Sequence, residues 1–175
     1  MRLRNKRVAV LVEEGFEDLE FWVTVMRLQE EGARVTFVGL EAGKTVRGKT
    51  ALTAVSDAAA EAVRPDDFDA LVVPGGWAPD KLRRYDSVKT LVRGVYAQGK
   101  IVGLICHAGL VAISAGVIPP GSRATGSLGI KDDLVNAGAV WVDEPAFRAG
   151  QRVWGRIVAD IPAFCRELVA AIENP

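Results

Sequence analysis

Four short apolar runs, separated by longer segments with helical patterning, leave few folds open to this chain. The runs lie at residues 7–12, 34–40, 70–73 and 101–105. Each is too short for a buried helix and is rich in Val, Ile, Leu or Ala, so each predicts a parallel strand covered on both faces. Strands that alternate with helices predict a doubly wound, mostly parallel sheet inside a three-layer α/β/α sandwich of the flavodoxin-like kind.

The segments between and after these runs predict the helices and the remaining strands. Residues Leu19, Trp22, Val23, Met26 and Leu28 have helical spacing and predict one apolar helix face. The other predicted elements are a hairpin over 44–57, helices over 86–98, 130–137 and 160–173, a strand over 140–142 and a hairpin over 147–156. No repeat or linker interrupts the pattern, so we expect a single domain over residues 1–175.

Composition limits the partners and the compartment. The chain has 22 basic and 22 acidic residues and no basic run, which argues against nucleic acid or an anionic membrane as the main partner. The apolar run after the basic N-terminus is too short for a signal peptide or a membrane span. Two cysteines far apart in sequence fit a reducing compartment, so we expect a cytoplasmic protein.

A cysteine directly follows the fourth apolar run, and the only histidine of the chain follows the cysteine. After Cys106 and His107 come small residues and an apolar segment over 110–115. This layout is typical of a buried strand that turns sharply into a helix, where backbone N–H groups and the helix dipole favour a thiolate. We interpret Cys106 as a reactive thiol rather than a small buried hydrophobe. Cys165 lies inside the last predicted helix and is interpreted as a packing residue.

Two other predicted strand ends carry groups that complement a thiol. Gly75 and Gly76 can offer backbone N–H groups to an oxyanion, because no Cβ stands in the way. The acidic turn over 13–18 can supply a carboxylic acid that donates a hydrogen bond to the thiolate. Glu17 is the preferred candidate, ahead of Glu13 and Glu14, and a solvated turn with helix capping is the alternative.

The sequence excludes several other kinds of site. One histidine and two separated cysteines do not make a zinc or transition-metal centre. There is no P-loop and no dinucleotide fingerprint, so we expect neither a metal nor a cofactor. A glutaminase of the amidotransferase type needs a histidine far downstream of its cysteine, and no histidine follows His107.

Five longer motifs run through nearly the whole chain, at residues 15–20 (GFEDLE), 68–76 (FDALVVPGG), 105–107 (ICH), 113–117 (ISAGV) and 129–139 (GIKDDLVNAGA). Together they make the sequence similar to the PfpI family of intracellular cysteine proteases, within the class I glutamine amidotransferase-like superfamily. Trp77 departs from the usual arginine, and Ala108 and Gly109 replace a more familiar Gly-Pro. Of the usual Thr-Ser-Arg strand end, only Arg156 is kept.

The resemblance implies a role for each matching residue. Cys106 is implied as the nucleophile, His107 as its partner, Glu17 as the glutamate that contacts the thiol and Gly76 as an oxyanion donor. Asp80 stands where the family carries a glutamate that orients the histidine from a neighbouring subunit. Since the family forms dimers that assemble into hexameric rings, the resemblance implies a homodimer or homohexamer.

The resemblance also implies an activity. Many family members act as glyoxalases or deglycases on methylglyoxal and glycated proteins, so we expect a cofactor-independent cysteine enzyme of that type. An intracellular peptidase that uses the same cysteine and histidine is one alternative. A non-enzymatic sensor of oxidants or a chaperone is another, because accessible thiols with a low pKa oxidise selectively.

Overall fold

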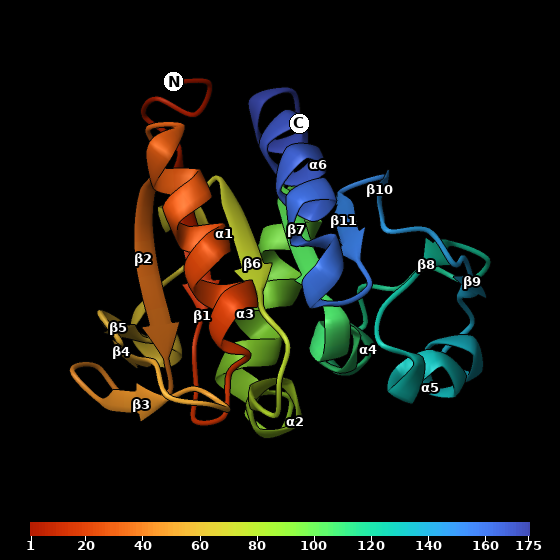
Figure 1. Cartoon of the computed structure of the whole chain (residues 1–175), viewed down its shortest axis with the longest axis horizontal. Helices are drawn as coiled ribbons and strands as arrows, with labels where there is room; N and C mark the ends of the chain where they lie inside the picture. The colour runs from red at the N-terminus through yellow and green to blue at the C-terminus, as the bar shows by residue number, and fades with distance from the viewer.

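A seven-stranded sheet forms the centre of the protein, whose computed structural model describes residues 1–175 (Figure 1). Its strands are β1 (Arg7–Leu11), β2 (Arg34–Gly39), β5 (Ala58–Ala59), β6 (Ala70–Val73), β7 (Ile101–Ile105), β10 (Ala146–Ala149) and β11 (Arg152–Gly155). They lie in the order β10-β11-β7-β6-β1-β2-β5, and every pair is parallel except β10–β11. The four predicted apolar runs are therefore β1, β2, β6 and β7, four adjacent parallel strands.

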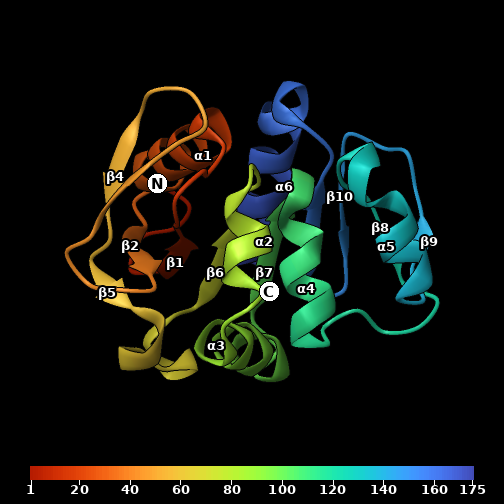
Figure 2. The same cartoon turned by 90° about the horizontal axis from the view of Figure 1, so that it is seen from below.

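Helices cover both faces of this sheet. They are α1 (Asp18–Glu30), α2 (Ala78–Leu82), α3 (Asp86–Ala97), α4 (Gly109–Ala115) and α6 (Ile161–Glu173), while α5 (Lys131–Asn136) lies to the side, against α4 and the small β8–β9 sheet (Figure 2). Helices α1 and α6 contact each other on one face, and α3 and α4 contact each other on the other face (Figure 2). This arrangement confirms the predicted three-layer α/β/α sandwich. None of the helices combines the length and the apolar character that spanning a membrane requires.

Two small sheets lie beside the main one. Strands β3 (Thr45–Arg47) and β4 (Thr53–Val55) form the predicted antiparallel hairpin. Strands β8 (Arg123–Ala124) and β9 (Val140–Trp141) pair in parallel, so the strand predicted at 140–142 belongs to this separate pair rather than to the main sheet.

The core is one cluster of 49 buried residues that surrounds the central strands. All five residues of β7 and all four of β6 are buried, as expected for parallel strands with helices on both faces. Gly103 lets α6 approach β7 closely, because a Cβ there would lie 2.8 Å from Leu168 Cδ1. Helix α6 therefore packs directly on the middle of β7.

The apolar face predicted for the first helix is only partly correct. Leu19, Val23 and Met26 are 47%, 40% and 59% exposed, and the side that packs on the sheet carries Phe21 and Val25. Of the predicted residues, Leu28 is buried and Trp22 is partly buried against the core. The helix has apolar residues on more than one side, so helical spacing alone could not decide which side the sheet covers. The three exposed residues, which we call the α1 stripe, are left on the surface.

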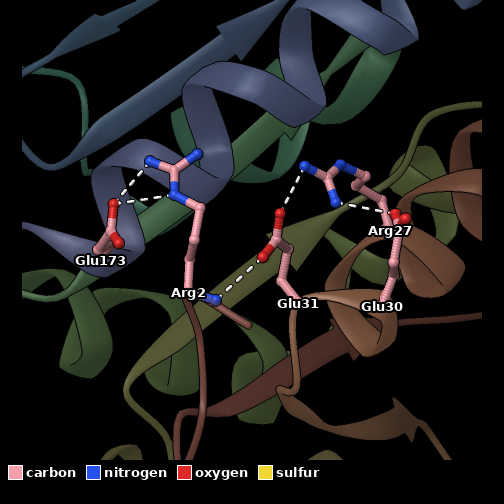
Figure 3. A network of polar contacts seen from close by, with 5 residues as sticks. All are labelled: Arg2, Arg27, Glu30, Glu31 and Glu173. Atoms are coloured by element: carbon pink, nitrogen blue, oxygen red, sulfur yellow. Dashed lines mark hydrogen bonds and ion pairs between the residues drawn. The ribbon is translucent and has the colours of Figure 1, made fainter.

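The first residues of the chain are joined to the ends of α1 and α6 by a polar network (Figure 3). The backbone N–H of Arg2 donates to Glu31 at 3.0 Å, and its guanidinium pairs with Glu173 at 2.6 Å. Glu31 also accepts from Arg27 at 2.6 Å, and Arg27 pairs with Glu30 at 2.8 Å. These contacts lie at the end of the sheet opposite the carboxyl ends of the parallel strands, and Glu31, which is buried, is their centre (Figure 3).

Candidate active site

Cys106 lies at a sharp turn between β7 and α4. The residue has φ +60°, in the left-handed region that non-glycine residues rarely adopt, and it begins a 3₁₀ turn over Cys106–Ala108. The neighbouring loop comes very close, since a Cβ on Gly75 would lie only 2.7 Å from Cys106 Cβ. The predicted turn from strand to helix therefore exists, and it presents the thiol at the carboxyl edge of the sheet.

The structure brings the three predicted strand ends together, because β1, β6 and β7 are neighbours in the sheet. The turn after β1 and the glycines after β6 are joined by main-chain hydrogen bonds. Glu17 N donates to Gly75 O at 3.1 Å, and Trp77 N donates to Gly15 O at 2.8 Å. The acidic turn and the glycine loop thus form one wall of the site, with the cysteine turn beside it.

Glu20, not Glu17, is the carboxyl group that meets the thiol. The Glu17 carboxylate is the N-cap of α1 and accepts from the N–H groups of Leu19 and Glu20, both at 2.9 Å. Glu20 lies almost one turn further along the helix, on the side that faces the sheet, and it is fully buried. Its Oε2 accepts from Gly75 N at 2.7 Å, and its carboxyl lies close enough to the Cys106 thiol for each group to shift the pKa of the other.

The position predicted for Glu17 therefore needs correction. A capping carboxylate turns back toward the first N–H groups of its own helix and cannot also enter the site. The other acidic residues of the turn have structural partners as well: Glu14 accepts from Arg47 N at 2.9 Å, and Asp18 accepts from Leu52 N at 2.8 Å. Glu20 could have been found in the sequence, because it is a lone carboxylate on the same helix side as Phe21 and Thr24.

Glu20 and Cys106 titrate as a pair. Burial raises the pKa of Glu20 to about 7, and the Gly75 N–H opposes this effect. Burial and the nearby Glu20 charge raise the pKa of Cys106 to about 12, although the N–H groups of His107 and Gly76 act in the opposite direction and lower it. The pair thus holds two protons below about pH 7 and one proton above it. The thiolate expected from the sequence forms here only when Glu20 keeps that proton.

His107 faces the thiol in spite of being its neighbour in sequence. Its Nδ1 lies 3.2 Å from Cys106 Sγ, since the left-handed residue and the 3₁₀ turn bring the two side chains to one side. Burial lowers the pKa of His107, and the Lys49 charge lowers it further. The imidazole is therefore neutral near pH 7 and can accept a proton. Its Nε2 makes no hydrogen bond within the chain.

Two backbone N–H groups favour the negative form of the Cys106 thiol. The N–H groups of Gly76 and His107 lower the pKa of Cys106, and Gly76 has φ +82°, which suits glycine. These two donors are placed to stabilise negative charge at or next to the sulfur. The N–H of Gly75, in contrast, is engaged by Glu20, so Gly75 serves to position that carboxyl group.

The remaining residues of interest lie around this centre. Asp80 is on α2, 57% of its side chain is exposed, and it pairs with Arg84 of the same helix. Within one chain it forms no ion pair with His107. Trp77 is exposed beside Gly76, with Lys49 Nζ 5.5 Å from its ring centroid. Lys49 also influences the titration of Glu20 and His107, and nothing in the local sequence pattern pointed to it.

No cavity opens directly onto the Cys106 thiol. None of the three cavities in the structure includes Cys106 among its lining residues. A cavity of about 290 Å³ borders the site at Gly126, where a Cβ would lie 2.6 Å from Cys106 O. No group of three or more His, Cys, Asp or Glu side chains is arranged to hold a metal ion.

The sequence matches a known protein family over nearly its whole length. The model of the DJ-1/PfpI family matches residues 6–171. The chain belongs to the DJ-1/PfpI family. This finding confirms the resemblance inferred from the motifs.

Other DJ-1/PfpI proteins are similar over most of the chain. A deglycase of Pyrococcus abyssi is 40% identical over 167 residues, which are 95% of this chain and 99% of the relative. Protein/nucleic acid deglycase 2 of Escherichia coli is 39% identical over 93% of this chain and 95% of its own length. A two-domain protein of Anabaena variabilis, with DJ-1/ThiJ/PfpI-like and ferritin-like domains, has a TM-score of 0.92 and 33% identity. The match covers 95% of this chain and 48% of that protein.

Proposed function

We propose that this protein is a cofactor-independent thiol enzyme of the deglycase and glyoxalase type, acting on reactive aldehydes such as methylglyoxal or on their adducts with proteins. The observation that carries the proposal is the contact of the Cys106 thiol with two proton-transfer groups, Glu20 and His107. The names of the relatives from Pyrococcus abyssi and Escherichia coli support the same activity.

The first step is the addition of the thiol to the aldehyde. The Cys106 sulfur forms a bond to the aldehyde carbon, the carbonyl π bond breaks, and its oxygen takes the proton held by the Glu20–Cys106 pair. The product is a hemithioacetal. The N–H groups of Gly76 and His107 stabilise the negative charge that develops during the addition.

The second stage moves a proton and releases the product. His107, neutral and 3.2 Å from the sulfur, removes the proton from the former aldehyde carbon, and a proton is returned to the adjacent carbon. This internal oxidation–reduction gives a lactoyl thioester of Cys106. Water then cleaves the carbon–sulfur bond, which yields lactate and restores the thiol. No external oxidant or reductant is needed.

The shape of the site favours a small electrophile over a peptide. A peptidase binds an extended chain along a groove, whereas Cys106 is half-buried and lines none of the cavities of the structure. A two- or three-carbon aldehyde needs no groove. For the same reason, we propose that a modified protein substrate contacts the site only through its aldehyde adduct. The balanced charge of the chain supports no dedicated nucleic-acid surface.

A homo-oligomer, either a dimer or a hexamer, fits two features of the surface. The α1 stripe of Leu19, Val23 and Met26 is an exposed apolar surface along that helix. His107 Nε2 lacks a partner within the chain, and Asp80 of a second copy is the carboxylate that we propose to orient it. Both cysteines are free, which supports a reducing cytoplasm as the compartment.

The test compares purified protein on methylglyoxal, on a methylglyoxal-treated amine and on peptide substrates. We expect turnover of the first two, and its loss in Cys106→Ala, with Cys165→Ala unchanged as the matched thiol control. Turnover by Cys106→Ala equal to that of the wild type would overturn the proposal. Cleavage of peptides alone would support the peptidase alternative, and sulfinic Cys106 after mild peroxide with no turnover would support a sensor.

A further inference from the structure

The loop between β3 and β4 is fastened to the wall of the site on both sides of Lys49. Gly15 N donates to Arg47 O at 2.7 Å, and Lys49 N donates to Phe16 O at 2.9 Å. Beyond Lys49, the Asp18 carboxylate accepts from the next three N–H groups of the loop, at 3.0, 3.1 and 2.8 Å. The backbone at Lys49 is therefore held against the turn that follows β1.

Lys49 is the one charged residue between β3 and β4, and the fold leaves its amine unused. The side chain is exposed, and the ion pairs that lysines form within the chain are those of Lys44 and Lys89. The carboxylates of Glu17 and Asp18, at the start of α1, are engaged by backbone N–H groups. Lys49 can therefore pair with an anion that comes from outside the chain.

Trp77 places Lys49 at the mouth of the thiol site. The Nζ of Lys49 lies 5.5 Å from the centroid of the Trp77 ring, and this tryptophan is 62% exposed. Trp77 follows Gly76 and stands two residues after Gly75, which packs against Cys106. The cation–π contact is worth only about 0.5–1 kcal/mol at an exposed position, so it steers the amine without occupying it.

The charge of Lys49 reaches the groups that flank the thiol. It lowers the pKa of both Glu20 and His107. Exposed charges interact appreciably only within about 10 Å at ordinary ionic strength. A negative charge on a molecule bound at Cys106 is therefore attracted by the same ammonium group.

We propose that Lys49 makes the site selective for negatively charged α-oxoaldehydes over neutral ones of similar size. The inference rests on the proposed reaction at Cys106 and names the substrate class within it. The ammonium group pairs with an anionic group on the substituent of the substrate, and the exposed ring of Trp77 supplies an apolar surface beside it. Lys49 moves no proton in the reaction, so its role is in specificity.

Turnover of phenylglyoxal and 4-carboxyphenylglyoxal, which differ by one carboxylate, tests this selectivity. We expect Lys49→Met to lower kcat/KM for the carboxylate compound about threefold or more relative to phenylglyoxal. The ratio between the two substrates cancels any change in the pKa of Glu20 or His107, because both substrates react at the same groups. Lys49→Arg keeps the charge and should keep the wild-type ratio. Lys6→Met, at the opposite end of the sheet, is the matched control.

Alkylation of Cys106 by iodoacetate and by iodoacetamide tests Lys49 without any turnover. Each reagent forms a carbon–sulfur bond and releases iodide, while the thiol proton passes to water, but only iodoacetate is charged. We expect the ratio of the iodoacetate rate to the iodoacetamide rate to fall about threefold or more in Lys49→Met. In the wild type, about 0.5 M NaCl should lower the ratio toward the same value.

The two experiments separate this inference from the proposed function. An alkylation ratio in Lys49→Met equal to that of the wild type would overturn the role of Lys49, and so would an unchanged preference between the two glyoxals. A wild type that turns over no α-oxoaldehyde would refute the proposed function, and the alkylation ratios would still decide whether Lys49 attracts anions to Cys106.

Discussion

The carboxyl group of Glu20 and the thiol of Cys106 lie together against Gly75 at the carboxyl edge of the sheet, since a Cβ on Gly75 would collide with Glu20 Oε2 and lie 2.7 Å from Cys106 Cβ. Two negative charges so close together are unfavourable, because Glu20 is fully buried, Cys106 is half-buried and neither forms an ion pair. Above about pH 7 the pair therefore keeps one proton, which either the carboxyl oxygen or the sulfur can hold. Its position decides whether Cys106 is a nucleophile, and four of the following predictions test the groups that control it.

Replacing the acidic side chain of Glu20 by a neutral one is expected to impair catalysis. Glu20→Gln keeps the size of the side chain and the oxygen that accepts from Gly75, but it has no acidic proton to share with the sulfur. We expect kcat/KM for methylglyoxal to fall about 10²-fold or more, the usual effect of losing a proton-transfer group. Steady-state kinetics at about pH 7.5, just above the pKa of Glu20, measures this loss of kcat/KM.

Glu17→Gln is the matched control for this variant. The amide oxygen of the introduced glutamine can still cap α1, and Glu17 does not meet the thiol. Activity is expected to stay within about threefold of the wild type. A large loss in Glu17→Gln together with normal activity in Glu20→Gln would restore the role that the sequence motif suggested for Glu17.

The pH dependence of the reaction is expected to follow the first deprotonation of the pair. Since Glu20 has a pKa raised to about 7 by burial, kcat/KM should rise as pH increases through about 7 and then level off. Glu20→Gln is expected to lack this rise. The same midpoint in both proteins would assign the titration to another group, such as His107.

Stability is expected to depend on pH through the same carboxyl group. Burial raises the pKa of Glu20 from 4.5 to about 7, so folding favours the protonated form. Its contribution is fully present below pH 4.5 and is lost as pH rises through about 7, by about 3 kcal/mol. Urea unfolding of Glu20→Gln and wild type should show the variant gaining relative stability between these pH values. A constant difference would contradict the raised pKa.

Asp18 is expected to stabilise the wall of the site. Its buried carboxylate accepts from the N–H groups of Thr50, Ala51 and Leu52, which join the β3–β4 loop to the start of α1. Burial opposes ionisation, yet these N–H groups prevail and lower the pKa of Asp18 to about 2. Asp18→Asn should lower the free energy of unfolding, measured in urea at pH 7, by about 1–3 kcal/mol, because an NH₂ group replaces one of the two oxygens that accept these hydrogen bonds.

The sign of the Asp18 effect can be checked at low pH. A lowered pKa means that the contribution is present above pH 3.8 and is lost as pH falls through about 2. The difference between wild type and Asp18→Asn should therefore shrink in acid. A difference that grows in acid would contradict the assignment.

The sequence predicted the frame of the molecule better than the details of the site. Residues 101–105 form β7 as predicted, because an apolar run ended by small residues has few other outcomes. Strands β5 and β8 have two residues each, too few to show a pattern. The buried side of α1 was assigned only in part, since apolar residues occur on more than one side of that helix.

The same ambiguity explains why Glu20 was missed. Choosing between Glu17 and Glu20 requires knowing which residue caps α1 and which side of the helix packs on the sheet. Both depend on tertiary contacts. The approach of His107 Nδ1 to the sulfur likewise depends on the left-handed conformation of Cys106, which no local preference predicts for a cysteine.

Alkylation of Cys106 as a function of pH tests the shared proton most directly. The wild type and Glu20→Gln are treated with iodoacetamide, and the rate at the Cys106 peptide is followed by mass spectrometry, with buried Cys165 as the internal control. We predict that the wild-type rate rises with a midpoint at about pH 7, where the pair loses its first proton, and that Glu20→Gln reacts only at higher pH. Identical profiles for the two proteins would contradict the account.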